Sequence, residues 1–172
     1  MKAIVHKVYG PPAVAQLTEV ANPIPKDKEV LVKVVASTVN RTDAGFRSAV
    51  YFISRFWSGL FRPKQQTLGS EFAGTIEAIG KEVSLFKIGD EVFGYNDVSF
   101  GGHAEYLTIS EDAAITTVPN NMTWHQSAAL TEGAHYALSI IKAANVKANQ
   151  KVMVYGATGA IGSAAVQLLK YF

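Results

Sequence analysis

The sequence contains no cysteine. This absence excludes disulfides, a thiolate nucleophile and zinc sites built on thiolate ligands. No apolar run is long enough to span a membrane, and the 16 basic and 14 acidic residues form no block of one sign. Neither a nucleic-acid partner nor an anionic membrane is therefore indicated. The apolar segment at the N-terminus, within Met1–Lys7, is too short and too charged to be a signal peptide. We therefore expect a cytoplasmic protein.

Residues 1–120 carry patterns typical of β structure. Short apolar segments alternate with glycine and proline turns, and Glu29–Ser37 is the clearest of them because it is rich in β-branched residues. Gly74 interrupts one apolar segment, which indicates a bulge or a close approach of two backbones. Asn40 or Thr42 is placed to cap a short helix. Further strands are expected at 3–5, 16–20, 72–79, 91–95 and 113–118, and residues 99–109 give a glycine-linked entry to another strand. Together they predict a small barrel-like domain.

Residues 48–66 combine many large apolar side chains with little helical or strand periodicity. One interpretation is a surface loop that its own aromatic side chains fold onto the core. The other is a mobile hydrophobic wall of a substrate pocket, because apolar residues in loops often mark binding surfaces. The side chains concerned are Val50, Tyr51, Phe52, Ile53, Phe56, Trp57, Leu60 and Phe61.

The pattern becomes helical after Pro119, and we place a domain boundary there, between 1–120 and 121–172. Thr123 and Gln126 have the spacing of a capping box at the start of a helix. Apolar residues from Ala134 onwards recur with a period near 3.6, which predicts a second helix that ends around Asn145. Thr131 and Glu132 are expected at the start of this second helix.

An apolar run, a glycine turn and an amphipathic helix end the sequence. Val152–Tyr155 reads as a strand buried on both faces, and Gly156, Gly159 and Gly162 follow at three-residue spacing. Such a turn brings backbone N–H groups and a helix N-terminus to a phosphate. The alternative is a plain strand-to-helix connection whose glycines serve only the turn. A second strand, which would carry the residue that reads the cofactor ribose, does not follow within the sequence.

Taken together, these motifs resemble the medium-chain dehydrogenase/reductase superfamily, and within it the zinc-free quinone oxidoreductase-like branch. The resemblance implies an α+β protein, with a GroES-like β-barrel domain at 1–120. It implies at 121–172 the truncated start of a Rossmann α/β domain, made of helices, one strand and one helix. The active site would lie in the cleft between the two domains. The matching motifs include Met1–Val5, Glu29–Val34, Val39–Ala44, Gly69–Ile76, Ile88–Gly94, Gly101–Tyr106 and Gly156–Gly162.

The resemblance also implies a cofactor and a substrate class. The full-length protein would use NADPH or NADH, with NADPH preferred, to reduce a small quinone, enone or related carbonyl compound. It would form a homo-oligomer, most simply a dimer, while the present chain alone would be inactive. The cofactor would contact Gly156, Ala157, Thr158, Gly159, Ala160, Ile161 and Gly162, together with Thr131.

Zinc-dependent relatives hold their catalytic zinc with a cysteine before a Thr-Asp pair and a histidine in a Gly-His-Glu triplet. The matching positions here are Asn40 and Ser70, and neither is a reasonable zinc ligand. We therefore expect no metal. By resemblance Asn40 would face the nicotinamide, although its residue type and position also suit a helix cap. Asp43 is expected to stabilise the first helical turn, and His103 is expected to be structural.

In the interpretation of residues 48–66 as a pocket wall, the apolar wall of the substrate pocket is formed by Tyr51, Phe52, Trp57 and Phe61. Two other functions stay open at this point. The β domain could serve for binding or assembly without catalysis, and the chain could be a relative of the zinc alcohol dehydrogenases. Asn40 and Ser70 disfavour the second of these alternatives.

Overall fold

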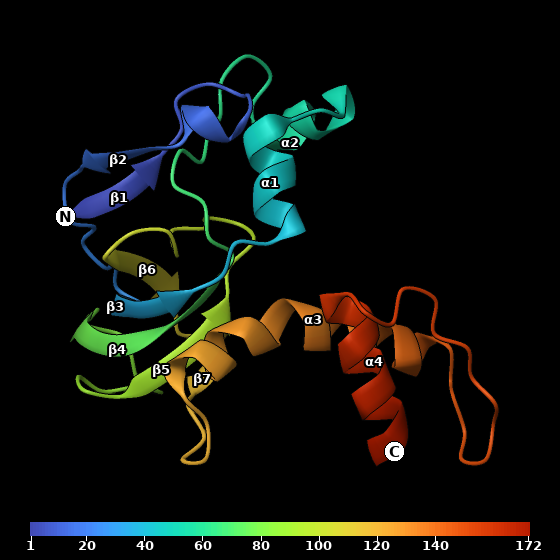
Figure 1. The fold of residues 1–172 in the computed structure, drawn as a ribbon. Coiled ribbons are helices and arrows are strands. Elements are labelled where there is room, and N and C mark those ends of the chain that lie inside the picture. Colours follow the sequence, from blue (N-terminus) through green and yellow to red (C-terminus); the bar gives the residue numbers. More distant parts are fainter. The chain divides into compact units, whose positions relative to one another are not determined.

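The computed structural model describes residues 1–172 and divides them into two units, Met1–Ala128 and Ala129–Phe172. Figure 1 shows the course of the chain through both. The helix α3 (Trp124–Ala143) begins in the first unit and continues into the second. None of the helices combines the length and the hydropathy that a membrane span requires.

The first unit is built on a five-stranded antiparallel sheet with the strand order β6-β3-β4-β5-β7. Its strands are β3 (Glu29–Ser37), β4 (Glu71–Ile79), β5 (Glu91–Tyr95), β6 (Tyr106–Ser110) and β7 (Ala114–Thr117). A separate antiparallel pair is formed by β1 (Lys2–Val5) and β2 (Gln16–Glu19). The predicted strands of residues 1–120 are therefore confirmed, with shifts of a few residues at their ends.

The core of this unit follows from the two-residue alternation of strand side chains. On β3, Val30 and Val32 point to the same face and are fully buried, and Phe72 and Ile76 of β4 pack against them. The pairing of β3 with β4 shifts register on both sides of Val34, which lies opposite Gly74. A side chain at Gly74 would place its Cβ 2.1 Å from the carbonyl oxygen of Lys33, so the predicted close backbone approach is confirmed.

A short helix and a single-turn helix lie between β3 and β4. These are α1 (Arg41–Ser48) and α2 (Arg55–Ser58), and a 3-10 turn at Phe52–Ser54 joins the second one. Asn40, one of the two residues predicted as the cap, caps α1. Another 3-10 turn covers Pro12–Val14 after β1.

The helical part differs from the prediction in one respect. We predicted two helices between residues 123 and 145, but α3 is continuous over Trp124–Ala143. Its sequence is rich in alanine, and the single Gly133 lowers helix propensity without breaking the helix. Thr131 and Glu132 therefore lie inside a helix and not at its start. The predicted capping box is confirmed, because the Gln126 backbone N–H donates to Thr123 Oγ1 at 3.3 Å and the Thr123 N–H donates to Gln126 Oε1 at 2.9 Å.

The apolar segment Val152–Tyr155 is not a strand in the structure, so this part of the prediction was wrong. A strand needs a neighbour for its N–H and C=O groups, and no other segment pairs with these residues. The side chains of Met153 and Tyr155 are 89% and 97% exposed as a result. The helix predicted after the glycine turn is present as α4 (Ala160–Tyr171).

A buried carboxylate holds the loop between β4 and β5. Glu111 accepts the backbone N–H of Leu85 at 2.7 Å and that of Ser84 at 2.8 Å. These two hydrogen bonds, Leu85 first, lower the pKa of Glu111 below its ordinary value, and partial desolvation opposes them. Because the folded pKa is lowered, this contribution to stability is complete above the unfolded pKa and is lost as the pH falls through the folded pKa.

We predict that Glu111→Gln makes the free energy of unfolding less dependent on pH on the acid side. The neutral amide still fills the site, but it cannot provide the charge that favours folding above the unfolded pKa. Urea unfolding of both proteins between about pH 3 and pH 7 would measure this difference. Asp112→Asn, an exposed neighbour, is the control. Parallel acid limbs for wild type and Glu111→Gln would contradict the prediction.

We predict that Phe72→Ala lowers the free energy of unfolding by about 3–5 kcal/mol, because it removes a fully buried aromatic ring and leaves a cavity. Phe72 is 0% exposed and belongs to the main core cluster. Leu85→Ala, at an exposed apolar position, is the matched control and should change stability by less than about 0.5 kcal/mol. Urea unfolding followed by far-ultraviolet circular dichroism measures both. A small loss for Phe72→Ala would mean that the β3–β4 core is not what stabilises this unit.

Candidate functional site

Asn40 forms a capping box at the start of α1. Its Oδ1 accepts the backbone N–H of Asp43 at 2.9 Å, and Asp43 Oδ2 accepts the N–H of Asn40 at 3.2 Å. The amide Nδ2 donates to Ser70 Oγ at 2.9 Å and lies 3.5 Å from Glu71 Oε2. The cap uses only the amide oxygen, so the amide nitrogen remains available for a second task.

Asp43 connects α1 to the start of β4. Its side chain is buried, and Oδ1 accepts the backbone N–H of Gly69 at 2.9 Å. His103 Nε2 lies 3.7 Å from Asp43 Oδ2 and donates to the carbonyl oxygen of Thr38 at 2.7 Å. Since a carbonyl oxygen only accepts, this bond places the proton of the neutral ring on Nε2. Both residues thus hold backbone groups in place, which agrees with the structural roles that we expected.

The side chains of Ser70, Glu71 and Thr38 complete this largely buried cluster. Ser70 is 0% exposed, and the Glu71 carboxylate accepts a hydrogen bond from the Thr38 hydroxyl. The Ser37 hydroxyl donates to the backbone carbonyl of Glu71 at 2.7 Å. We call Thr38, Asn40, Asp43, Ser70, Glu71 and His103 the polar cluster.

The polar cluster does not fit a zinc ion. The structure contains no group of three or more histidine, cysteine, aspartate or glutamate side chains arranged to hold a metal. At the two positions that match the ligands of zinc-dependent relatives, an amide and a hydroxyl are hydrogen-bonded to each other. Neither group is an ordinary zinc ligand. The cluster thus satisfies its polar atoms through internal hydrogen bonds.

The four predicted pocket residues do not join the polar cluster. Tyr51, Phe52, Trp57 and Phe61 are 62–86% exposed on the segment around α2. A groove of about 640 Å³ in the first unit is bordered by Asp43 and His103, but by none of these four aromatic residues. Their exposure also rules out a loop folded onto the core by its aromatic side chains.

His6 borders this groove and is buried. Burial lowers the pKa of His6, the neighbouring Arg47 lowers it further, and a hydrogen bond to the Gln66 carbonyl opposes both. The net effect lowers the pKa of the His6 ring below its ordinary value.

The glycine turn presents an open helix N-terminus. Gly159 is the N-cap of α4 and makes no side-chain cap, and the first hydrogen bond of the helix runs from Ser163 N to Gly159 O at 2.8 Å. The N–H groups of Ala160, Ile161 and Gly162 therefore precede the first intrahelical bond. Residues Gly156–Ile161 are exposed. Such an end favours a phosphate.

Glycines are required in this turn by close contacts. Gly156 has a φ of 76°, in the left-handed region. A Cβ on Gly162 would lie 2.1 Å from the Gly156 carbonyl oxygen, and a Cβ on Gly133 of α3 would lie 3.0 Å from the Ala160 carbonyl oxygen. Gly133 was missed by the sequence analysis. The signal that could have found it is an isolated glycine inside an otherwise helical pattern.

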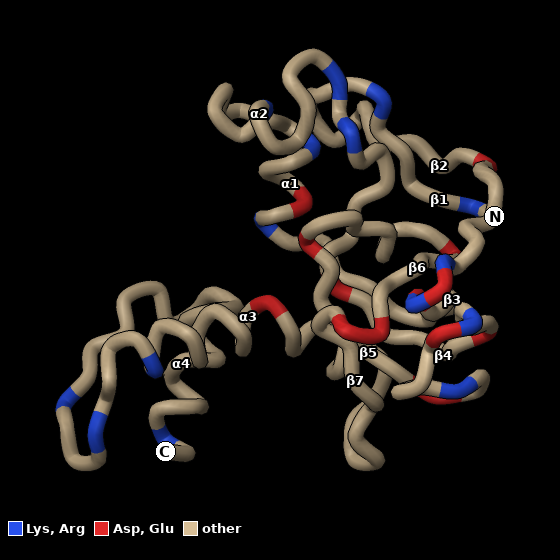
Figure 2. Tube along the Cα trace, turned by 180° about the vertical axis from the view of Figure 1, so that it is seen from behind, with Lys and Arg blue, Asp and Glu red and all other residues tan.

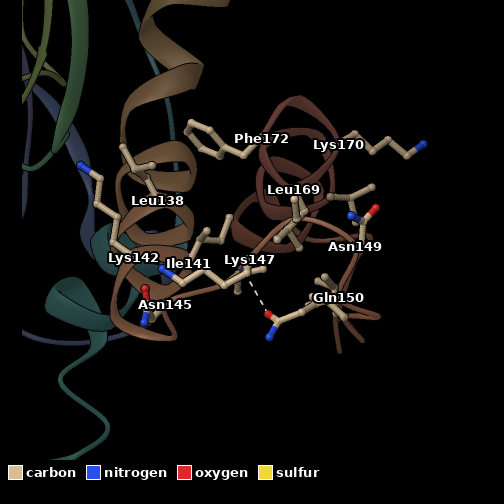
Figure 3. A pocket seen from close by; sticks show the side chains of 15 residues that line it. Leu138, Ile141, Lys142, Asn145, Lys147, Asn149, Gln150, Leu169, Lys170 and Phe172 are labelled. Carbon is tan, nitrogen blue, oxygen red and sulfur yellow. Dashed lines mark hydrogen bonds between the residues drawn. The ribbon is translucent and has the colours of Figure 1, made fainter.

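A second groove, of about 810 Å³, lies between α3 and α4 (Figure 3). Leu138 and Ile141 of α3 face Leu169 of α4 across it, and a hydrogen bond of 2.9 Å from Lys147 N to Gln150 Oε1 closes the loop below. No residue of the glycine turn borders this groove. This groove exposes the apolar stripes of both helices. It does not include the glycine turn, whose N–H groups could bind a phosphate.

Comparison with known proteins gives consistent similarities along the chain. Residues 26–120 match the family described as "Alcohol dehydrogenase GroES-like domain". The quinone oxidoreductase of Homo sapiens is 38% identical over 177 residues, an alignment that covers 100% of this chain and 50% of that protein. The chain thus spans about half the length of the relatives that it matches.

Solved structures show the same relation. The quinone oxidoreductase from Coxiella burnetii superposes with a TM-score of 0.88 at 29% identity, covering 99% of this chain and 53% of that one. A mycobacterial protein complexed with NADPH superposes with a TM-score of 0.82 at 28% identity, covering 99% and 50%.

We predict that Asp43→Ala lowers the free energy of unfolding by at least about 1–3 kcal/mol, because the buried N–H of Gly69 loses its acceptor. Asp43→Asn should retain part of the stability, since an amide oxygen can still accept this bond. Asp112→Ala, at an exposed site, is the control. Urea unfolding compares the three proteins. Equal stability of Asp43→Ala and wild type would show that the carboxylate does not hold the polar cluster together.

Proposed function

The chain belongs to the alcohol dehydrogenase GroES-like domain family of the medium-chain dehydrogenase/reductase superfamily, and we propose that it is the N-terminal portion of an NAD(P)H-dependent oxidoreductase. Its substrates are quinones, enones or related carbonyl compounds, and its reaction is independent of zinc. The observation that carries this proposal is the hydrogen bond between Asn40 Nδ2 and Ser70 Oγ at the two positions that would otherwise hold a catalytic zinc. The high similarity to quinone oxidoreductases over the whole chain supports it.

The glycine turn fits the pyrophosphate of a dinucleotide. Its open N–H groups and the positive end of the α4 dipole offer hydrogen bonds to phosphate oxygens. We assign cofactor contacts to Gly156–Gly162, and to Thr131 on the helix that also carries Gly133. When bound, the reduced nicotinamide supplies the hydride. We retain NADPH as the preferred cofactor, and the mycobacterial relative complexed with NADPH supports this choice.

Asn40 supplies the hydrogen-bond donor that a carbonyl substrate needs. Hydride addition to a quinone or an enone places negative charge on the substrate oxygen, and a fixed N–H donor stabilises that charge. Of the two Nδ2 hydrogens, one is held by Ser70 at 2.9 Å, while the other has only the longer 3.5 Å contact with Glu71. The second hydrogen is therefore the one that a substrate oxygen can accept. The capping bond from Asp43 N fixes the orientation of the amide.

The remaining residues have supporting roles in this proposal. Tyr51, Phe52, Trp57 and Phe61 provide apolar contacts for the substrate ring and exclude water from it. Asp43 does not act as an acid, because both of its oxygens accept backbone N–H groups. The substrate oxygen, which becomes negatively charged on hydride addition, takes its proton from water.

A non-catalytic binding or assembly domain is the second candidate function. The open glycine turn favours the enzyme, since a binding module has no need of a phosphate site. The amide–hydroxyl pair, in turn, argues against a zinc alcohol dehydrogenase.

The test uses the full-length protein and the oxidation of NADPH and of NADH with a quinone and with an enone. We expect Asn40→Ala to lower kcat/KM by about 100-fold, as the loss of an oxyanion donor does. Asn40→Ser is the matched variant, because serine keeps the helix cap and lacks the amide N–H. It should fold like wild type and show the same catalytic loss.

Several outcomes would contradict the proposal. One equivalent of zinc in the purified protein, or loss of activity after chelation, would restore the zinc-dependent alternative. Full activity of Asn40→Ser would remove Asn40 from the site. Failure of the full-length protein to bind either cofactor would favour the binding domain. The 172-residue chain alone should show little or no turnover.

A further inference from the structure

Gly133 is a buried residue in the interior of α3. Its φ is not positive, so the backbone conformation at this position does not require glycine. In the interior of a helix, glycine is less favourable than every other residue except proline. The local structure of α3 therefore gives no reason for a glycine here, and the reason must lie in what the residue touches.

Gly133 lies directly against the first residue of α4, within the same unit of the chain. A Cβ on Gly133 would lie 3.0 Å from the carbonyl oxygen of Ala160 and 3.1 Å from its carbonyl carbon. Two carbon atoms attract each other most strongly at about 3.5–4.0 Å, so the second distance is too short. The glycine thus allows the backbone of α3 to contact a peptide group of α4.

This peptide group also carries one of the open N–H groups of the glycine turn. The Ala160 carbonyl and the Ile161 N–H belong to the same peptide group, which is planar. The Ile161 N–H precedes the first hydrogen bond of the helix, which runs from Ser163 N to Gly159 O. A side chain at Gly133 that displaces the Ala160 carbonyl therefore displaces the Ile161 N–H with it.

The first turn of α4 is also held by other close contacts. The Ser163 hydroxyl donates to the Ala160 carbonyl at 3.1 Å, and Gly159 N donates to Gly156 O at 3.0 Å. A Cβ on Gly162 would lie 2.1 Å from the Gly156 carbonyl oxygen. A methyl group added from the side of α3 must therefore shift an already closely packed turn by a few tenths of an ångström.

Charge around the glycine turn does not oppose an anion. No acidic residue follows Glu132 in the sequence, and the basic residues that follow it are Lys142, Lys147, Lys151 and Lys170. Figure 2 shows this along the chain, with basic and no acidic positions from the end of α3 to the C-terminus. Since no carboxylate lies on α4 or on the turn before it, the alignment of the open N–H groups governs how well a phosphate is held.

We propose that Gly133 is a positioning residue for the dinucleotide cofactor. Its missing side chain sets the place of the Ile161 N–H, and through it the affinity for the pyrophosphate. This inference rests on the proposed function, because it concerns the cofactor assigned there to Gly156–Gly162. Gly133 itself does not contact the cofactor. A substitution by alanine should weaken cofactor binding even though alanine favours the helix that carries it.

The test measures the dissociation constant of NADPH and of NADH for the full-length protein, from the change in cofactor fluorescence on binding. We expect Gly133→Ala to raise the Kd at least about fivefold and Gly133→Val at least about 30-fold, within the range for the loss of one hydrogen bond to a charged group. At saturating cofactor, kcat should change less than about twofold, because the lost interaction holds ground state and transition state alike.

The ADP-ribose part of the cofactor separates the pyrophosphate from the nicotinamide. ADP-ribose, or its 2′-phosphate where NADPH is preferred, contains the pyrophosphate and lacks the nicotinamide ring. Its Kd, measured by calorimetry, should rise by the same factor as that of the whole cofactor.

Gly45→Ala is the matched control. Gly45 also lies inside a helix, α1, but a Cβ there would meet no atom within 4 Å. Neither Gly45→Ala nor Gly133→Ala should lower the midpoint of urea unfolding, since alanine favours a helix more than glycine does. Only Gly133→Ala should weaken cofactor binding. If Gly133→Val does not fold, Gly133→Ala decides the test.

Three results would overturn this inference and leave the proposed function intact. The first is an unchanged Kd for Gly133→Ala when the wild type binds the cofactor. The second is a loss of affinity for the whole cofactor without a loss for ADP-ribose, which would place the effect at the nicotinamide. The third is a loss of affinity only where the urea midpoint also falls, as a purely structural role requires. A wild type that binds neither cofactor would instead remove the proposed function, and this inference with it.

Discussion

The hydrogen bond from Gly69 N to Asp43 Oδ1 is the contact on which the organisation of the polar cluster depends. It joins the first turn of α1 to the entrance of β4, two segments that are otherwise connected by a long and irregular stretch of chain. The other oxygen of the same carboxylate accepts the N–H of Asn40. One buried side chain thus fixes the cap of α1 and the backbone before Ser70. The amide of Asn40 reaches Ser70 as a consequence.

This arrangement is consistent with the zinc-independent reaction that we propose. A zinc ion would hold two side chains together from opposite segments by coordination. Here Asn40 and Ser70 come from the same two segments and are held by a direct hydrogen bond of 2.9 Å. A buried polar network is stable only where its members are satisfied. The pair of Asn40 and Ser70 therefore depends on the surrounding hydrogen bonds made by Asp43, Thr38 and His103.

Local patterns predicted much of the fold and part of the site. The strands, the cap at Asn40, the capping box at Thr123 and the close approach at Gly74 all follow from neighbouring residues or from side-chain alternation. The Asn40–Ser70 contact does not, because it joins residues far apart in the sequence. The resemblance to a family named both positions, but only the structure shows their bond. At Val152–Tyr155 composition predicted a strand, and the absence of a pairing neighbour overrode it.

The polar cluster and the aromatic side chains around α2 show opposite departures from the ordinary distribution of residues. In one, Asp43, Ser70 and Glu71 are buried; in the other, aromatic side chains are exposed. Each departure lowers stability unless a partner compensates for it. For the polar cluster the partners are within the first unit, as the hydrogen bonds show. For the exposed aromatic side chains around α2, the first unit provides only the support of Tyr9, Ser58 and Gly59 from below. Burial within the first unit therefore does not account for these side chains, and the contact with a substrate ring that we propose would compensate for their exposure.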